Sequence, residues 1–224
     1  MKKIVSLFMF SFLFAGFPDY YYKLSIKQQQ KEFSKILKPM IDKENSKILA
    51  ERQKIIDIFN IPMFMMNKNN MMILSKLAKK YNISDIYDKQ AFLKKIDIIP
   101  EKLVLAQAAI ESAWGRSYFV RNANNMFGEW DYSGKGMIPR HRDPGKTHTI
   151  RIFKSLEDSL ASYMRNLNRN PAYKEFRDLR YKYRKENKPF DAMIAATALQ
   201  RYSELGKEYV RILQLVIKNF NKGK

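Results

Sequence analysis

Apolar side chains recur at helical spacing over most of this chain, so that each segment carries one apolar stripe among polar residues. The ranges with this pattern are 24–59, 71–81, 88–96, 101–113, 155–169, 189–199 and 206–219. Asp88 and Ser155 stand where helix N-caps are expected. Pro39 lies inside the first range, and because proline removes an intrahelical hydrogen bond we expect a kink or a break there. The pattern predicts a mostly helical protein.

One segment departs from the helical period. Residues 136–153 contain two runs that suit β-strands, on either side of the turn sequence Asp-Pro-Gly-Lys at residues 143–146. We expect a β-hairpin here, packed beside the helices as one wall of a cleft. The predicted fold class is therefore α+β, mostly helical, with a small hairpin lobe.

Residues 1–17 differ in character from the rest of the chain. Two lysines precede a nearly unbroken apolar run over residues 4–17, as in a secretory signal peptide. This run is shorter than the about 20 residues that a membrane-spanning helix needs. We expect export to the periplasm or cell envelope, with this segment either cleaved near Ala15 and Gly16 or retained as a short anchor.

The remaining chain divides into two predicted parts. Residues 18–70 form a helical extension and linker, and residues 71–224 form the main domain. The long amphipathic range 24–59 suits a helix that packs over the main domain, and its basic character also suits a membrane surface or a partner. A chain of 224 residues with 46% hydrophobic content can bury a sizeable core.

The charge balance points to an anionic partner. Lys and Arg number 42 against 22 Asp and Glu, which gives a net charge of +20 spread over the whole chain. Such a charge suits nucleic acid, a membrane surface or a bacterial wall polymer. Residues 173–184 interleave basic and aromatic side chains as nucleic-acid surfaces do, but an exported protein does not meet nucleic acid, so we expect none. The absence of Cys excludes disulfides and thiol catalysis.

Glu111 is the most distinctive acidic residue of the sequence. It lies near the end of the range 101–113, which is otherwise rich in Ala, Leu, Ile and Val, and it shares a helical face with Gln107. A carboxyl group among Ala, Ile and Trp side chains should have a raised pKa, which suits a general acid near neutral pH. Alternatively, Glu111 caps the helix or pairs with an Arg and does no chemistry.

The segment AQAAIESAWGRS, which contains Glu111, and the following NNMFGEW closely resemble the signature of bacterial cell-wall glucosaminidases, glycoside hydrolase family seventy-three. The segments NLNRNPAYKEFRDLR and YSELGKEYV resemble the Bax-type branch of that family, so the resemblance extends from about residue 88 to the C-terminus. It implies a lysozyme-like fold, Glu111 as the catalytic acid, and peptidoglycan glycan strands as the substrate.

The same resemblance implies further site residues. The family's Asn-x-Phe-Gly segment lines the saccharide groove, which gives that role to Asn125, Phe127 and Gly128. Trp130 is a stacking candidate, because aromatic faces bind pyranose rings by apolar contact. Tyr202 stands where the family has its active-site tyrosine, although a core aromatic would fit that position equally well.

Glycoside hydrolysis usually needs a second carboxylate. The resemblance implies that it lies in the hairpin lobe, where Asp143 at the predicted turn is our choice and Glu129 and Asp131 are alternatives. The N-acetyl group of the substrate could also take this role. Arg140 in the hairpin is a candidate for binding acidic groups of the wall.

We expect no metal and no cofactor. His141 and His148, without Cys or an acidic cluster, do not make a zinc site. The predicted reaction is hydrolysis of a β-1,4 bond on the N-acetylglucosamine side, with Glu111 as proton donor, Asp143 ordering water or stabilising the oxocarbenium-like state, and Tyr202 giving a hydrogen bond. The alternatives are a lytic transglycosylase and a non-catalytic module that binds an anionic polymer.

Overall fold

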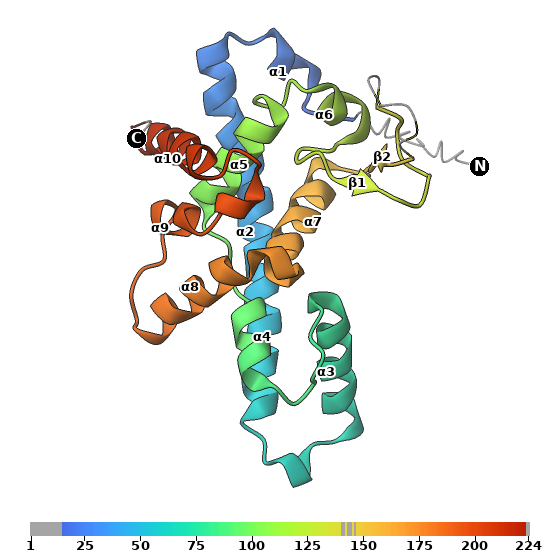
Figure 1. The fold of residues 1–224 in the computed structure, drawn as a ribbon, viewed down its shortest axis with the longest axis vertical. Helices are drawn as coiled ribbons and strands as arrows, with labels where there is room; N and C mark the ends of the chain where they lie inside the picture. Colours follow the sequence, from blue (N-terminus) through green and yellow to red (C-terminus); the bar gives the residue numbers. More distant parts are fainter. Residues whose placement is uncertain (1–14, 140–141, 143–144, 146, 223–224) are drawn as a thin grey trace, which may run out of the picture.

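The computed structural model describes residues 15–139, 142, 145 and 147–222. It is a body of helices with one small antiparallel sheet, which confirms the predicted mostly helical α+β class (Figure 1). Within the described residues the α-helices are α1 (Asp19–Lys23), α2 (Ile26–Phe59), α3 (Lys68–Tyr81), α4 (Lys89–Lys95), α5 (Glu101–Ser112), α6 (Tyr118–Ala123), α7 (Leu156–Arg169), α8 (Lys174–Lys185), α9 (Ala192–Thr197) and α10 (Lys207–Lys222). The same described ranges also contain the short 3-10 turns η1 (Met63–Met65), η2 (Pro171–Tyr173) and η3 (Gln200–Tyr202).

Helix α2 runs along the long axis of the molecule (Figure 1). Ser25 and Gln28 form a capping box at its start. The prediction was a kink or a break at Pro39; the helix continues through this residue, so the break is wrong, and the kink stays a prediction. Leu37 and Ile41 on either side of the proline are fully buried, and this packing holds the helix together despite the lost hydrogen bond.

Helix α5 is the central element and packs against α2, α9 and α10 (Figure 1). Its apolar side chains are buried around the whole circumference, because small residues let the neighbouring helices approach from several sides.

Two predicted N-caps elsewhere are confirmed, since the side chain of Asp88 caps α4 and that of Ser155 caps α7. No helix in the described part of the chain is long and apolar enough to cross a bilayer.

The sheet consists of β1 (Trp130–Asp131) and β2 (Thr149–Ile150), paired antiparallel. The prediction placed both strands within residues 136–153, but the first strand lies earlier, and the described residues of the predicted first run contribute a bridge from Met137 to Ile150. The physical reason is the Asp131 carboxylate, which accepts hydrogen bonds from Ser133 and from the backbone of Lys135 and so turns the chain directly after β1.

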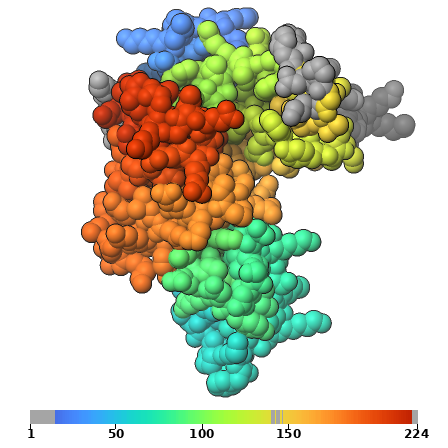
Figure 2. Space-filling view, in the orientation of Figure 1, coloured from blue at the N-terminus to red at the C-terminus, as the bar shows by residue number. Residues whose placement is uncertain are grey.

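The lower half of α2, together with η1, α3 and α4, projects from the body as an arm (Figures 1 and 2). The predicted division between residues 18–70 and 71–224 falls inside α3 and stays a prediction. Residues 1–14 of the predicted signal segment lie outside the described residues, whereas Phe17 is buried and its ring stacks on Tyr21 and Phe33.

Candidate active site

A groove of about 490 Å³ opens at the C-terminal end of α5. Among the described residues two carboxylates line it, Glu111 from α5 and Glu129 from the loop before β1. Tyrosines from three other elements complete its wall, namely Tyr163 from α7, Tyr173 from η2 and Tyr202 from η3. The groove therefore combines acids with aromatic and hydroxyl groups, as a saccharide site requires.

A strained turn positions Glu111 at the groove. Helix α5 ends at Ala113 and Trp114, which both have left-handed backbone angles, with φ of 48° and 56°. Gly115 follows with φ of 75°, and a Cβ placed there would lie 2.4 Å from the ring of Phe17. Ser112 fixes the turn by accepting a hydrogen bond from the backbone of Gly115. Packing beneath the turn thus holds Glu111 in the last turn of the helix.

The carboxylate of Glu111 reaches solvent through the groove and, among the described residues, accepts one side-chain hydrogen bond. Tyr209 donates its hydroxyl to Glu111 Oε1 at 3.1 Å. Burial by the groove walls raises the pKa of Glu111, and the Tyr209 hydrogen bond lowers it to a smaller extent. Among the described residues Glu111 forms no ion pair, which speaks against the alternative in which it pairs with an Arg.

A buried chain of hydrogen bonds leads to this carboxylate. The hydroxyl of Tyr163 donates to Gln107 Oε1, and Gln107 Nε2 donates to the hydroxyl of Tyr209 at 3.0 Å. Because the Tyr209 oxygen accepts from Gln107, its own proton is directed at Glu111. The sequence prediction did not include Tyr209, although it is the second tyrosine of the quoted segment YSELGKEYV.

Tyr202 lies beside this chain rather than in it. Its ring stacks on that of Tyr209 with centroids 5.3 Å apart, and it lies 5.9 Å from the ring of Tyr173. Burial is the main cause of the raised pKa of Tyr202, and the charge of Glu111 adds to it. The hydrogen bond to Glu111 comes from Tyr209, while Tyr202 supplies a wall of the groove next to it.

The residues of the Asn-x-Phe-Gly segment occupy two different environments. Phe127 and Gly128 line the groove, and the ring of Phe127 stacks on Tyr163 with centroids 3.9 Å apart. Asn125 is buried behind them, where its side chain bonds to the backbone of Glu129 at both its oxygen and its nitrogen. Asn125 therefore shapes the loop that carries the lining residues, and its amide is occupied by the protein itself.

Trp130 stands at the rim of the groove. Its indole is 53% exposed and stacks on the ring of His148 at a centroid distance of 4.0 Å. Tyr132 beside it also lines the groove and is largely exposed. Since His148 supports the indole from one side, a flat apolar surface is presented beside the groove.

Glu129 is the second acid of the groove. Its Oε2 accepts a hydrogen bond from Ser162 at 2.8 Å and lies 3.6 Å from Arg151, whereas its buried Oε1 has no partner among the described residues. Burial raises the pKa of Glu129, and Ser162 and Arg151 lower it to a smaller extent. Burial is the main cause of the raised pKa of Tyr173, and the charges of Glu111 and Glu129 add to it, so this phenol lies within electrostatic reach of both acids.

The other predicted acids and bases lie elsewhere. The Asp131 carboxylate holds the turn after β1, and its hydrogen bonds to Ser133 are the main cause of its lowered pKa. Asp143, Arg140 and His141 lie outside the described residues. Within the residues that the structure describes, no three His, Asp or Glu side chains gather as a metal site.

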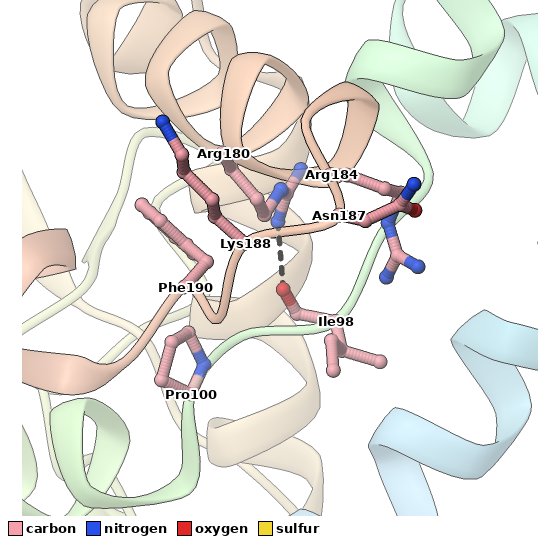
Figure 3. A pocket seen from close by; sticks show the side chains of 7 residues that line it. All are labelled: Ile98, Pro100, Arg180, Arg184, Asn187, Lys188 and Phe190. Carbon is pink, nitrogen blue, oxygen red and sulfur yellow. Dashed lines mark hydrogen bonds between the residues drawn. The ribbon is translucent and has the colours of Figure 1, made fainter.

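A second cavity of about 250 Å³ lies at the opposite end of α5, beside Pro100 (Figure 3). No carboxylate lines it. Arg180 donates to the backbone carbonyl of Ile98, as the dashed line in Figure 3 marks, and Arg184 pairs with the buried Asp97. These guanidinium groups serve the fold, and the cavity holds no proton donor for glycosidic chemistry.

Comparison with known proteins agrees with the geometry of the groove. The profile of the glucosaminidase family, described as mannosyl-glycoprotein endo-beta-N-acetylglucosaminidase, matches residues 87–222. Protein bax of Escherichia coli (strain K12) is 31% identical over 200 residues, which cover 87% of this chain and 71% of that protein. No solved structure matches the chain significantly.

Two more distant relatives carry names that state an activity. Exo-glucosaminidase LytG of Bacillus subtilis (strain 168) is 27% identical over 183 residues, covering 69% of this chain and 60% of that protein. Peptidoglycan hydrolase FlgJ of Escherichia coli (strain K12) is 25% identical over 127 residues, covering 46% of this chain and 41% of that protein. The chain thus spans about half the length of these two relatives.

Proposed function

Because this chain belongs to the glucosaminidase family and is a glycoside hydrolase, as the segment around Glu111 predicted, we propose that it hydrolyses β-1,4 bonds of bacterial peptidoglycan. The bond cleaved is on the N-acetylglucosamine side. Relatives named as a peptidoglycan hydrolase and an exo-glucosaminidase support this substrate class. The net charge of +20 suits a polymer that carries acidic groups.

Glu111 is the general acid of the proposed reaction. The single observation that carries this role is its position in the groove, held by Tyr209 and free of ion pairs among the described residues. Burial keeps the carboxyl protonated to higher pH than usual, so that it can donate its proton to the glycosidic oxygen as the bond breaks. The anomeric carbon then develops oxocarbenium character.

Glu129 is the second carboxylate that we propose. It lines the same groove, and its negative charge would stabilise the oxocarbenium-like state or accept the proton of an attacking water. Asp143 was the choice from the sequence and stays a prediction, because it lies outside the described residues. Assistance by the substrate's N-acetyl group is the remaining route; it would replace the second carboxylate, whether Glu129 or Asp143, and would still need Glu111 as the acid.

Aromatic and backbone groups bind the glycan in this proposal. Trp130 and Tyr132 would stack against pyranose rings at the rim, and Phe127 and Gly128 would line the base of the groove. Tyr202 would add a hydrogen bond beside Glu111. Arg140 remains a candidate for binding acidic groups of the wall. We further propose export to the periplasm or cell envelope, which the apolar run at residues 4–17 supports.

The decisive experiment compares purified wall digested by the wild type and by Glu111→Gln, with the released fragments identified by mass spectrometry. We expect reducing N-acetylglucosamine ends from the wild type and a loss of at least about 10³-fold in rate for the variant. Glu101→Gln is the matched control, since Glu101 lies in the first turn of the same helix and pairs with Lys38 away from the groove.

Other outcomes identify the competing functions. Products that lack one water and end in an anhydro sugar would make the protein a lytic transglycosylase. Wall binding without fragment release, unchanged by Glu111→Gln, would make it a non-catalytic module and overturn the proposal.

A further inference from the structure

Large apolar side chains gather in solvent at the far end of the arm. Phe64 is 89% exposed and Met63 is 64% exposed, and Met65 and Met72 are exposed to about the same extent as Met63. They belong to η1 and the second turn of α3, at the bottom of the views in Figures 1 and 2. A cluster of this kind on a protein surface marks an interaction site. We call these four residues the apolar tip.

The fold itself keeps the apolar tip exposed. The backbone of η1 is closed by hydrogen bonds from Met65 to Pro62 at 2.8 Å and from Met66 to Met63 at 3.2 Å. Asn67 then caps α3. Met66 and Met71 pack against the core and fill the space at the end of the arm. The side chains of the tip therefore have no interior site to occupy.

The segment of chain that carries the tip is basic. Residues 58–84 contain four lysines and no Asp or Glu. Lys68, Met72 and Lys76 follow one another at intervals of four residues on α3, so both lysines share a face with an exposed methionine. Among the described residues, neither Lys68 nor Lys76 forms an ion pair.

We propose that the apolar tip inserts into the interface of a bilayer that carries anionic phospholipids. Phe and unbranched Met side chains suit the disordered acyl boundary, because they make apolar contact without a fixed complementary shape. Lys68 and Lys76 would contact the phosphate groups of the lipid headgroups at the bilayer surface. The tip is a projecting apex and not a groove, so it penetrates a soft surface more readily than it docks a folded partner.

The test measures partition into vesicles of phosphatidylethanolamine and phosphatidylglycerol by co-sedimentation of the full chain. For Phe64→Ser combined with Met65→Ser we expect the partition coefficient to fall about tenfold or more, since burying one such side chain contributes more than the 1.4 kcal/mol that equals a factor of ten. All variants share the apolar run at residues 4–17, so the difference reports on the tip.

Two controls distinguish insertion of the tip from non-specific membrane binding by other exposed apolar side chains. Leu49→Ser combined with Leu215→Ser removes exposed apolar side chains from α2 and α10, outside the tip, and should leave partition unchanged. Fragment release from soluble muropeptides should be the same for wild type and for the tip variant, because no tip residue lines the groove.

The lysines give a second, independent measurement. Lys68→Gln combined with Lys76→Gln should weaken partition into the anionic vesicles about tenfold and leave the low partition into pure phosphatidylcholine unchanged. Lys182→Gln combined with Lys185→Gln on α8 is the matched control and should have little effect. A drop of equal size in this control would show that overall charge, and not the tip, drives binding, and would overturn the proposal.

Two further results would contradict the proposal. One is equal partition of the wild type and the Phe64→Ser, Met65→Ser variant. The other is a wild type that sediments as a dimer while that variant sediments as a monomer, which would make the tip an interface between copies of the chain.

Discussion

The hydrogen bond from Tyr209 holds Glu111 and also tunes its acidity. It stabilises the ionised carboxylate and so opposes the rise in pKa that burial causes. Positioning and acidity therefore depend on the same contact, and a change at Tyr209 alters both. The contact can be tested without removing the acid itself.

For Tyr209→Phe we expect the rate to fall about tenfold or more and the alkaline limb of the pH–rate profile to move to higher pH. The pKa of Glu111 rises when the hydrogen bond is lost, so the proton donor survives to higher pH. Steady-state rates on wall fragments across pH check this. Tyr202→Phe is the control for the pH shift: whatever it does to the rate as part of the groove wall, it should leave the alkaline limb in place, because Tyr202 makes no hydrogen bond to Glu111.

The second carboxylate can be assigned by a parallel set of variants. If Glu129 fills this role, Glu129→Gln should lower the rate by about 10²-fold or more, whereas Asp131→Asn should have a small effect because Asp131 only holds a turn. Loss of activity in Asp143→Asn together with full activity in Glu129→Gln would identify Asp143 as the second carboxylate. Full activity in both would favour assistance by the substrate.

At the scale of single elements, the turn after α5 links core packing to the active site. Gly115 has a left-handed backbone and the ring of Phe17 lies directly against it. Phe17 stacks on Tyr21 and Phe33 and is buried, so it cannot move aside. A side chain at Gly115 must therefore displace the turn that carries Glu111.

We expect Gly115→Ala to lower the free energy of unfolding by about 2 kcal/mol or more and to reduce activity as well. Gly134→Ala is the matched control, since Gly134 has a similar φ of 77° but nothing within 4 Å of the added methyl group. It should cost about 1 kcal/mol and leave activity unchanged. Urea unfolding followed by tyrosine and tryptophan fluorescence measures both. Equal losses would exclude the clash with Phe17 as the cause.

Elements with a strong local signal could be predicted from the sequence, and those set by distant contacts could not. The long helices, such as α2, α5 and α7, and the N-caps Asp88 and Ser155 follow from periodicity and capping chemistry, whereas the short helices α1 and α6 were not predicted. Strand β1 has only two residues, too few for an alternating pattern. The continuity of α2 through Pro39 depends on packing that overrides local preference.

The same distinction applies to the site. Glu111 could be identified from the sequence because an acidic residue within an otherwise apolar helical segment differs clearly from its sequence neighbours. Tyr209 contacts it across 98 residues of sequence, and this pairing depends on how α10 packs against α5. Asn125 has the residue type of a sugar-binding amide, but the need to satisfy buried backbone groups takes up its hydrogen bonds.

At the scale of the whole molecule, the acids of the groove oppose folding at neutral pH. The pKa values of Glu111 and Glu129 are raised in the folded protein, so the folded state binds protons more tightly than the unfolded state. Their stabilising effect is complete below the unfolded pKa of about 4.3 and is lost as the pH rises through the folded pKa values.

Glu111→Gln should therefore be more stable than the wild type at pH 7, with the difference vanishing near pH 4. Urea unfolding at the two pH values measures this. Glu101→Gln serves as the control and should show no gain at pH 7, because it removes a surface ion pair with Lys38. A Glu111→Gln variant that is less stable at pH 7 would contradict the argument.

Helix α2 connects the two ends of the molecule. Near its start, Phe33 packs against Trp114 in the turn after α5, and after its end comes the apolar tip. Its 34 residues span about 50 Å without interruption. With the tip inserted in a lipid surface, this helix would hold the groove at a fixed distance from the bilayer. The enzyme would then cut glycan strands at that distance and leave nearer and farther strands intact.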